Sequence, residues 1–270
     1  MLTEQEFANQ GLALSREAKV LDHLHNYFVS HCSRLYQTCR RFDLFDRELG
    51  AVLEVGPFYG YTPFILRPRT TSYYVLEGDD PAGYPLKPLY EKRQIKADFV
   101  DLFEIFGPTH TAAHALSFGD NSFDTALCWE TMEHFNFNPV KFVRELKRVL
   151  RPGGRACITV PNKVSLQNLI SFALGRSEEH LVDSYFTFED YVSQGKKAFY
   201  GFHWREYSAP ELRRLFDRAG FEILRCSTFV AFQNPSRPSF IRRLVRKADT
   251  LACTLLPRFG THVYLEARKQ

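Results

Sequence analysis

Two glycines and two glutamates have the types and the spacing to bind a cofactor. An apolar run at residues 51–55 contains Glu54 and leads into Gly56 and Gly60, and a second apolar run ends in Glu77. Glycine costs backbone entropy unless its freedom or small size is used, so the pair predicts a turn at which the backbone approaches a ligand closely. Glu77, about 20 residues further on, carries a carboxylate that only accepts hydrogen bonds, which suits the two hydroxyls of a ribose. The pattern predicts a cofactor whose polar end meets the glycine turn and whose ribose meets Glu77.

The same turn speaks against two common nucleotide sites. The dinucleotide fingerprint requires glycine at positions 56, 58 and 61, but Phe58 and Tyr61 stand at the last two, which argues against NAD. A phosphate-binding P-loop also fails, because the chain lacks its Gly-Lys-Ser/Thr sequence. The six cysteines are scattered without a C-x-x-C pair, and no histidine stands at metal-ligand spacing, so we expect no metal site.

A second group of candidate residues follows another apolar run. Trp129 and Glu130 close that run, and Glu133 and His134 come shortly after it. His134 and His203 are candidate general bases, because an unperturbed imidazole pKa near 6.5 suits removal of a hydroxyl proton near neutral pH. Simple core packing of Trp129 and a structural role for either histidine stay open as alternatives.

The elements that must position these residues alternate between strands and helices. Strands are predicted at residues 51–55, 73–77, 98–103, 125–129, 155–160, 221–229 and 261–268. Helices are predicted as two or three segments within 3–46, one from about Pro139 with Asn138 as its N-cap, and one behind the capping box Ser208-x-x-Glu211. This alternation predicts an α/β fold with a Rossmann-like, mostly parallel sheet covered by helices on both faces.

Two regions stand apart from this alternation. Residues 1–48 form a predicted N-terminal helical extension ahead of a cofactor-binding domain at 49–270. Residues 162–207 are rich in Phe, Tyr, His and Ser without clean periodicity, which predicts an insertion over the carboxyl edge of the sheet. Ligands of open α/β sheets bind at that edge, so we expect the insertion to act as a substrate lid.

Five motifs in correct order carry a resemblance to a known family. They are Val52-Leu-Glu-Val-Gly-Pro-Phe-Tyr-Gly60, Glu77, Leu116-Ser-Phe-Gly-Asp-Asn-Ser-Phe-Asp124, Trp129-Glu-Thr-Met-Glu-His-Phe135 and Arg148-Val-Leu-Arg-Pro-Gly-Gly154. Together they resemble class I S-adenosylmethionine-dependent methyltransferases over roughly residues 50–162. The resemblance implies a seven-stranded, mostly parallel sheet with an antiparallel last strand, and S-adenosyl-L-methionine as the cofactor. One departure is Phe58, where the family commonly has the middle glycine of the turn.

The resemblance also implies roles for individual residues. It places Gly56 and Gly60 near the methionine and ribose portions of the cofactor, and Glu77 on the ribose. In the same way it implies that Glu54 contacts the methionine amine through water or orders the loop. The remaining implied cofactor contacts are Asp101 at the adenine amino group, and Trp129 and Glu130 beside the sulfonium. The alternatives are Asp79 in place of Glu77 at the ribose, a fold-only role for Glu54 and a plain surface position for Asp101.

The acceptor is less sharply indicated. The two histidines favour O-methylation, and the segment after the fifth strand and the aromatic block before Ser208 look similar to bacterial methyltransferases of cell-surface glycan synthesis. This second resemblance implies a sugar hydroxyl on a lipid-linked or nucleotide-linked acceptor. The alternatives are a quinone or other aromatic metabolite and a non-catalytic binding or scaffold module. Nucleic acid is not expected, because the net charge is only +4 and no N/D-P-P-Y/F sequence follows the fourth strand.

Composition and termini predict where the protein works. With 270 residues, 44% of them hydrophobic, the chain can build a sizeable core, which excludes disorder as its main state. The sequence shows no signal-peptide pattern, its scattered cysteines form no recognisable pairs, and no apolar run is long enough to span a bilayer. These features predict a cytoplasmic protein whose cysteines are reduced. Residues 239–256 place apolar and basic side chains on different helical faces, which suits either packing on the chain's own domain or peripheral contact with an anionic membrane.

Overall fold

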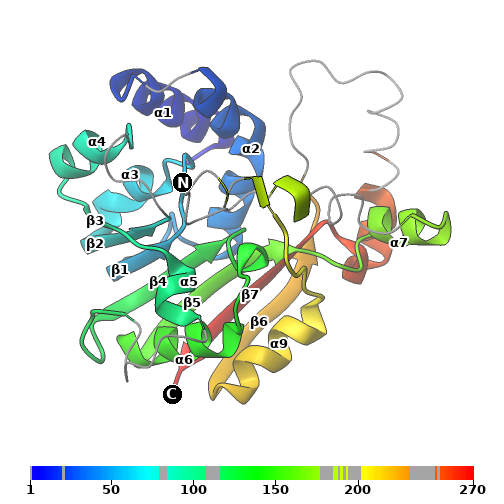
Figure 1. Ribbon diagram of the computed structural model, residues 1–270. Helices are drawn as coiled ribbons and strands as arrows, with labels where there is room; N and C mark the ends of the chain where they lie inside the picture. The colour runs from blue at the N-terminus through cyan, green and yellow to red at the C-terminus, as the bar shows by residue number, and fades with distance from the viewer. Residues whose placement is uncertain are drawn as a thin grey trace.

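Seven strands form one sheet in the order β3-β2-β1-β4-β5-β7-β6 (Figure 1). The strands are β1 (Gly50–Val55), β2 (Thr70–Glu77), β3 (Lys96–Phe99), β4 (Phe123–Trp129), β5 (Leu150–Pro161), β6 (Phe221–Phe229) and β7 (His262–Lys269). Neighbouring strands are parallel except at β7, which runs antiparallel to both β5 and β6. The predicted Rossmann-like, mostly parallel sheet with an antiparallel last strand is confirmed.

The structure is a computed structural model that describes most of the chain. The described residues are 2–19, 22–78, 84–107, 116–176, 185–187, 189–190, 193, 202–231, 247 and 250–270, with the backbone alone at 22–24. Asp79, much of the predicted lid and most of the basic stretch at 239–256 lie outside them. None of the helices within these ranges combines the length and the hydropathy needed to cross a bilayer.

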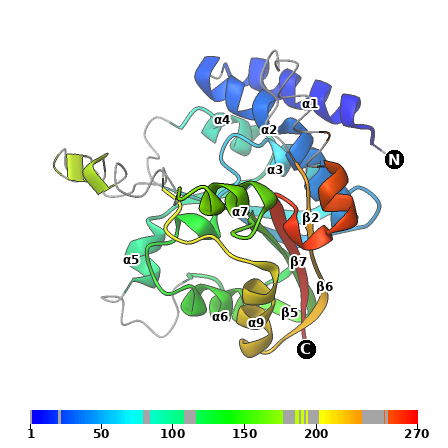
Figure 2. The same cartoon turned by 90° about the vertical axis from the view of Figure 1, so that its right-hand side faces the viewer.

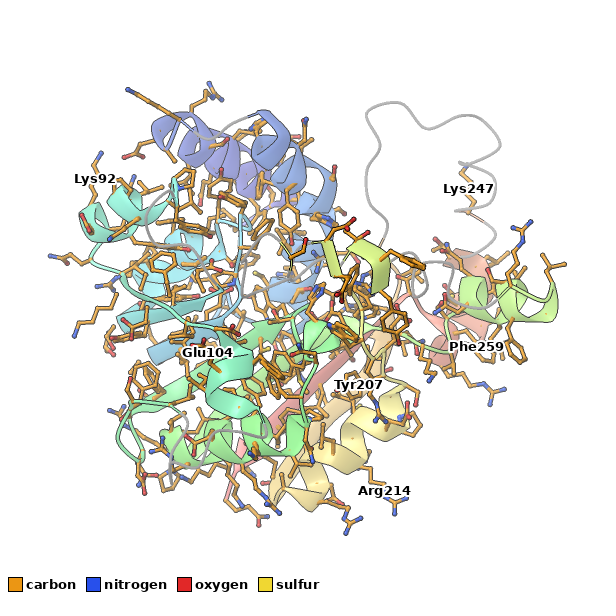
Figure 3. All side chains as sticks on the ribbon, viewed as in Figure 1. Lys92, Glu104, Tyr207, Arg214, Lys247 and Phe259 are labelled. Atoms are coloured by element: carbon orange, nitrogen blue, oxygen red, sulfur yellow. The ribbon has the colours of Figure 1, made fainter. Side chains whose placement is uncertain are left out.

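Helices cover both faces of the sheet (Figures 1 and 2). The helices are α1 (Glu4–Glu17), α2 (Asp22–Arg41), α3 (Thr62–Leu66), α4 (Lys87–Lys92), α5 (Leu102–Phe106), α6 (Pro139–Val149), α7 (Leu166–Ala173) and α9 (Ala209–Arg218). One apolar cluster joins the sheet to α5, α6 and α9, and a second joins its other face to α1 through α4. Charged side chains such as Lys92 on α4 and Arg214 on α9 lie at the periphery (Figure 3).

Local sequence signals set the helix ends as predicted. The Thr3 amide donates to the Glu6 carboxylate and the Glu6 amide donates to the Thr3 hydroxyl, which completes a capping box. Asn138 accepts a hydrogen bond from the Val140 amide at the start of α6. Both arrangements supply partners for amides that a helix leaves unpaired in its first turn.

Two predicted strand boundaries are wrong. The strand expected at 98–103 ends at Phe99, because the Asp101 side chain accepts the Phe103 amide at 2.8 Å and starts α5 instead. The strand expected at 155–160 begins earlier, at Leu150. Its register jumps from Leu150 to Arg155 opposite β4, so the Arg-Pro-Gly-Gly sequence forms a bulge within the strand.

The strand order reverses between β1 and β4. The chain proceeds outward from β1 through β2 to β3, and then returns to pair β4 on the other side of β1. In an open α/β sheet, a crevice for ligands opens at the carboxyl ends of the strands at such a reversal. The glycine turn after β1 and the segment after β4 therefore meet at the expected ligand position.

The chain leaves the sheet after β5 and returns beside its point of departure. Asn162 forms a parallel bridge with Tyr207, and the Lys163 amide donates to the Tyr207 carbonyl at 3.2 Å. Between these ends, α7 lies beyond the carboxyl end of β5 (Figure 2). The lid function assigned to 162–207 stays a prediction.

Candidate functional site

The glycine turn is in contact with the segment that follows β4. Gly56 has φ +67, in the left-handed region, and a Cβ atom there would lie 2.7 Å from the Thr131 hydroxyl oxygen. That hydroxyl donates to the backbone carbonyls of Val55 and Trp129 at 3.3 and 3.0 Å. A Cβ at Gly60 would lie 3.0 Å from the Pro57 carbonyl. The two glycines therefore allow close approach of the chain segments at the strand-order reversal.

Phe58 replaces a glycine of the family pattern and still adopts φ +49. Its ring packs edge-on against Tyr27 of α2, with centroids 4.8 Å apart, and against Tyr59 at 4.6 Å. The left-handed conformation disfavours residues with a side chain. These ring contacts oppose that strain, and they show that the N-terminal helix α2 covers the glycine turn.

Glu54 is buried near the end of β1, and protein groups occupy both its oxygens. The Thr62 hydroxyl donates to one oxygen at 2.7 Å and the Tyr73 hydroxyl to the other at 2.5 Å. Burial raises the pKa of Glu54 to about 7, although both hydrogen bonds act in the opposite direction. Through these two hydrogen bonds Glu54 helps to order the end of β1 and the start of α3.

Glu77 lies at the carboxyl end of β2 and is only 4% exposed. One carboxylate oxygen accepts hydrogen bonds from the Tyr84 hydroxyl at 2.7 Å and from the Tyr90 hydroxyl at 3.4 Å. Burial, followed by the charge of Glu54, raises the pKa of Glu77 to about 8, while the Tyr84 bond opposes the shift. A carboxyl group that already accepts hydroxyl donors beside the glycine turn fits the ribose of the expected cofactor.

Trp129 and Asp101 have structural partners of their own. The Trp129 indole nitrogen donates to the Cys157 carbonyl at 3.1 Å, and its ring stacks on Phe42 with centroids 6.5 Å apart. Asp101 is the N-cap of α5, directly after β3. Trp129 therefore packs in the core, which is the alternative given for it in the sequence analysis. Asp101 lies at the carboxyl edge of the sheet, where the adenine base of the cofactor is expected.

Glu130 forms part of a buried charge network. One of its carboxylate oxygens lies 3.6 Å from the Arg34 guanidinium and 3.4 Å from His262 Nε2. Burial alone would raise the pKa of Glu130, but the charges of His262 and Arg34 outweigh it and lower the pKa. Arg34 comes from α2 and His262 from β7, so the network joins the N-terminal helices to the carboxyl edge of the sheet.

The two candidate histidines lie together although they are distant in the sequence. The ring centroids of His134 and His203 are 5.0 Å apart in an edge-on arrangement. His134 Nδ1 lies 2.7 Å from the Phe202 carbonyl, which fixes this nitrogen as the protonated one in the neutral ring. Burial and the neighbouring His203 lower the pKa of His134 to about 4. His134 is thus uncharged at neutral pH, with Nε2 free to accept a proton.

Glu133 adds a buried carboxyl to this pair. Its side chain is 1% exposed, and one of its oxygens lies 3.9 Å from His134 Nε2. Burial, followed by the charge of Glu130, raises the pKa of Glu133 well above its usual range. The Trp204 amide donates to the Glu133 carbonyl at 2.7 Å and holds the segment of His203 against the sheet edge.

Four residues of this region escaped prediction from the sequence: Tyr27, Arg34, Tyr84 and His262. None has a spacing in the chain that relates it to the glycine turn or to the histidines. Tyr84 alone carried a usable signal, because it follows Glu77 by only seven residues and its hydroxyl donates to that carboxyl. The others approach through tertiary contacts of α2 and β7.

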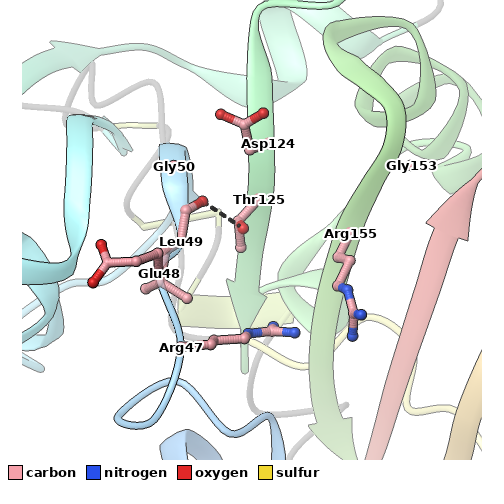
Figure 4. A pocket seen from close by; sticks show the side chains of 8 residues that line it. All are labelled: Arg47, Glu48, Leu49, Gly50, Asp124, Thr125, Gly153 and Arg155. Carbon is pink, nitrogen blue, oxygen red and sulfur yellow. Dashed lines mark hydrogen bonds between the residues drawn. The ribbon is translucent and has the colours of Figure 1, made fainter.

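An open cavity of about 450 Å³ lies at the opposite, amino edge of the sheet (Figure 4). Arg47 and Arg155 line it, but both guanidinium groups pair with Glu266, at 3.1 and 2.8 Å. Asp124, also in the lining, is held by the Ala51 amide and by Arg151. The charges of Arg47, Arg155 and Asp124 are therefore paired with neighbouring side chains, and the cavity is remote from the carboxyl edge of the sheet.

Comparisons with known proteins agree with this arrangement. A family model described as a methyltransferase domain matches residues 24–225. A probable S-adenosylmethionine-dependent methyltransferase of Mycolicibacterium smegmatis is 32% identical over 172 residues, which cover 64% of this chain and 52% of that protein. An uncharacterized protein of Methanocaldococcus jannaschii is 41% identical over 51 residues, 19% of this chain and 22% of its own. The chain thus spans about half the length, or less, of the curated relatives it matches.

Solved structures share the fold. A possible histamine N-methyltransferase of Thermotoga maritima has a TM-score of 0.53 at 17% identity, covering 96% of this chain and 100% of its own. A putative methyltransferase bound to the Trm112 activator of Haloferax volcanii has a TM-score of 0.57 at 15% identity, covering 98% and 97%. Because the family model spans most of the chain and the sheet has this fold, the chain belongs to the class I S-adenosylmethionine-dependent methyltransferases, and its cofactor is S-adenosylmethionine.

Proposed function

We propose that this chain transfers the methyl group of S-adenosylmethionine to a hydroxyl of a sugar, glycan or other small acceptor. The observation that carries the proposal is the pair of imidazoles, His134 and His203, with ring centroids 5.0 Å apart at the carboxyl edge of the sheet. A hydroxyl acceptor must lose its proton, whereas an acidic carbon or a thiol needs less help. His134 is uncharged and can accept that proton at Nε2, although its lowered pKa makes it a weaker base than a free imidazole.

The cofactor is expected to lie over the strand-order reversal. In our proposal the two ribose hydroxyls donate to Glu77, and Gly56 and Gly60 let the backbone approach the ribose and methionine portions. Glu54 orders the turn through the Thr62 and Tyr73 hydroxyls. Its buried position supports this indirect role rather than a direct contact.

Three further residues complete the proposed cofactor site. Asp101 follows β3 and is assigned to the adenine amino group, while Trp129 and Glu130 end β4 and are assigned to the sulfonium side. The indole nitrogen of Trp129 is bonded to the Cys157 carbonyl and one ring face stacks on Phe42, so only the opposite ring face remains for the cofactor. The network with Arg34 and His262 fixes the position of Glu130.

The proposed transfer is an in-line displacement at the methyl carbon. A lone pair of the acceptor oxygen forms the new O–C bond, and the S–C bond breaks with its electron pair left on sulfur. The sulfonium becomes a neutral thioether, and the hydroxyl proton passes to a histidine and then to water. The methyl group is already activated, so the protein acts chiefly by alignment and by accepting the proton.

A lipid-linked acceptor is favoured by exposed apolar side chains near the site. Ile170 is 53% exposed, Phe172 78% and Leu174 68%, all on or just after α7, and Leu251 and Leu255 are 63% and 73% exposed. Both groups lie on the side of the molecule to which β4 and β5 point (Figure 1). The basic sequence at 239–247 precedes the second group. Apolar side chains next to basic ones suit the surface of an anionic membrane.

The test is transfer of a labelled methyl group from S-adenosylmethionine to a panel of acceptors. The panel contains lipid-linked glycans, nucleotide sugars, and quinols as the aromatic alternative. We expect a methyl ether on a sugar hydroxyl, with a large loss of kcat in His134→Gln. Labelling of quinols alone would replace the sugar acceptor with an aromatic one. Cofactor binding without transfer to any acceptor would instead support the scaffold alternative.

A further inference from the structure

Three side chains at the carboxyl edge have the composition of a metal site. Glu133, His134 and His203 each offer a ligand atom, and these atoms all lie within 4.8 Å of one another. Glu133 and His134 come from the turn after β4, and His203 comes from the far end of the segment that leaves after β5. Two imidazoles and one carboxylate are a donor set used by catalytic zinc and by non-haem iron, with further positions left open.

The hydrogen bonds around the two rings favour metal binding. His134 Nδ1 is bonded to the Phe202 carbonyl at 2.7 Å, and His203 Nδ1 to the Glu206 carboxylate at 3.2 Å. Histidines that ligate metals nearly always donate their other ring N–H to a carbonyl or a carboxylate, which fixes the tautomer and the ring orientation. In both rings this leaves Nε2 as the unprotonated nitrogen.

Glu133 supplies an independent observation. Its side chain is 1% exposed, and its Oε2 atom is buried without a hydrogen-bond partner. The nearby Glu130 also has one unpartnered oxygen, Oε1, but its Oε2 lies 3.6 Å from the Arg34 guanidinium, which balances its charge. A buried, unpartnered carboxylate oxygen is costly unless a cation or a donor meets it. A divalent cation bound beside the two imidazoles would supply the missing partner of this oxygen and would hold the carboxyl in its ionised form.

We propose that Glu133, His134 and His203 bind a divalent transition-metal ion, such as Zn²⁺ or Mn²⁺. Around a tetrahedral ion with ligand distances of about 2.1 Å, ligand atoms stand about 3.4 Å apart, so binding draws the three groups together by about 1 Å. His203 is free to make this movement, because its side chain is 44% exposed. Two imidazoles favour such an ion over Mg²⁺, which prefers oxygen ligands.

The role of the ion rests on the proposed hydroxyl acceptor, whereas the binding site itself does not. Held by Glu133, His134 and His203, the ion would supply Lewis acidity that makes a nearby acceptor hydroxyl more acidic, so that its proton could pass to water. The two histidines then act as ligands, and the ion takes over the activation of the hydroxyl. The bonds formed and broken would be those of the transfer described above, except that the hydroxyl proton would pass directly to water.

The experiment is calorimetric titration of the full chain, stripped with a chelator, with ZnCl₂, MnCl₂ and MgCl₂. We expect one Zn²⁺ or Mn²⁺ per chain with micromolar or tighter affinity, and much weaker Mg²⁺ binding. His203→Gln and His134→Gln should each weaken binding by on the order of 100-fold. The exposure of His203 makes its variant the one that keeps its fold. His25→Gln is the matched control, since His25 faces Ser15 on the N-terminal helices.

The outcomes separate this inference from the proposed function. Binding weaker than millimolar, or binding that neither site variant changes, overturns the metal site. If no metal binds and a hydroxyl is still methylated, the metal site fails and the proposed function stands. If the metal binds as expected but no hydroxyl acceptor is methylated, the metal site stands and the proposed function fails.

Discussion

Replacing Glu77 tests the cofactor site most directly. Its carboxyl lies at the end of β2, and one of its oxygens accepts the Tyr84 hydroxyl at 2.7 Å. In the proposed complex the two ribose hydroxyls donate to this group. Glu77→Ala removes the acceptor, and Glu77→Gln keeps the shape of the side chain but removes its charge and its titration. Comparison of the two variants therefore separates the charge from the packing.

The expected magnitude follows from three contributions. Two hydrogen bonds to a charged carboxylate contribute about 4 to 5 kcal/mol, and giving up the Tyr84 bond offsets about 1 kcal/mol. Because the pKa of Glu77 is raised to about 8 by burial, ionising it at pH 7 costs about 1.4 kcal/mol more. The net is about 2 kcal/mol, so Glu77→Ala should weaken cofactor binding roughly 30-fold at pH 7. At pH 9 the ionisation cost disappears, and the loss should reach roughly 300-fold.

The assay is calorimetric titration with S-adenosylmethionine at pH 7 and pH 9. The ionised form of Glu77 is the one that binds the ribose, so the affinity of the unmodified protein should rise about tenfold over this interval. Glu77→Gln should lack that rise, and any change from the cofactor's own amine or from Glu54 should appear equally in both proteins. Equal affinities of the unmodified protein and Glu77→Gln at both pH values would refute the ribose assignment.

The remaining predictions concern the N-terminal helices, the glycine turn and the exposed apolar residues. Arg34→Ala leaves the buried carboxylate of Glu130 short of a partner and should lower the free energy of unfolding by about 3 kcal/mol in urea titrations. The control is Arg40→Ala, which breaks the more exposed pair with Asp46 and should change the free energy of unfolding by under about 1 kcal/mol. Gly56→Ala should lower both Tm and cofactor affinity, because its Cβ would lie 2.7 Å from the Thr131 hydroxyl oxygen. Gly175→Ala is the control, because Gly175 also has a positive φ but its Cβ would meet no atom within 4 Å, so this variant should retain cofactor affinity. Phe172→Ser should reduce co-sedimentation with vesicles containing phosphatidylglycerol, and binding equal to that of the unmodified protein would contradict a membrane-facing role.

Prediction from the sequence succeeded where the signal was local. Asn138 and Pro139 start α6 because the cap and the fixed φ act within one turn, and the apolar run around Glu54 forms β1 because it is buried on both faces. The third strand was misplaced because Asp101 has two readings in sequence, a strand residue or a helix cap, and only the Phe103 amide decides between them.

Contacts between residues that are far apart in the sequence could not be predicted from it. The sequence indicates His134 and His203 as separate candidate general bases. Their contact depends on how the chain returns to the edge of the sheet after the segment that follows β5. The expectation of no metal site rested on spacing within the sequence, and such spacing carries no information about side chains of two separate segments that meet only in the fold, such as Glu133, His134 and His203. The pairing of Arg34 with Glu130 likewise requires α2 to pack across the end of β4.

The bridge between Asn162 and Tyr207 has a consequence for how the protein can change. The chain departs from and returns to one place on the sheet, so the intervening segment can vary in length or composition without moving the strands that carry Gly56 and Glu77. Acceptor preference can then diverge between descendants of one ancestor while the methyl donor stays the same. For engineering, the same join marks where a segment from another methyltransferase can be exchanged, provided that residues 202–207 and with them His203 are retained.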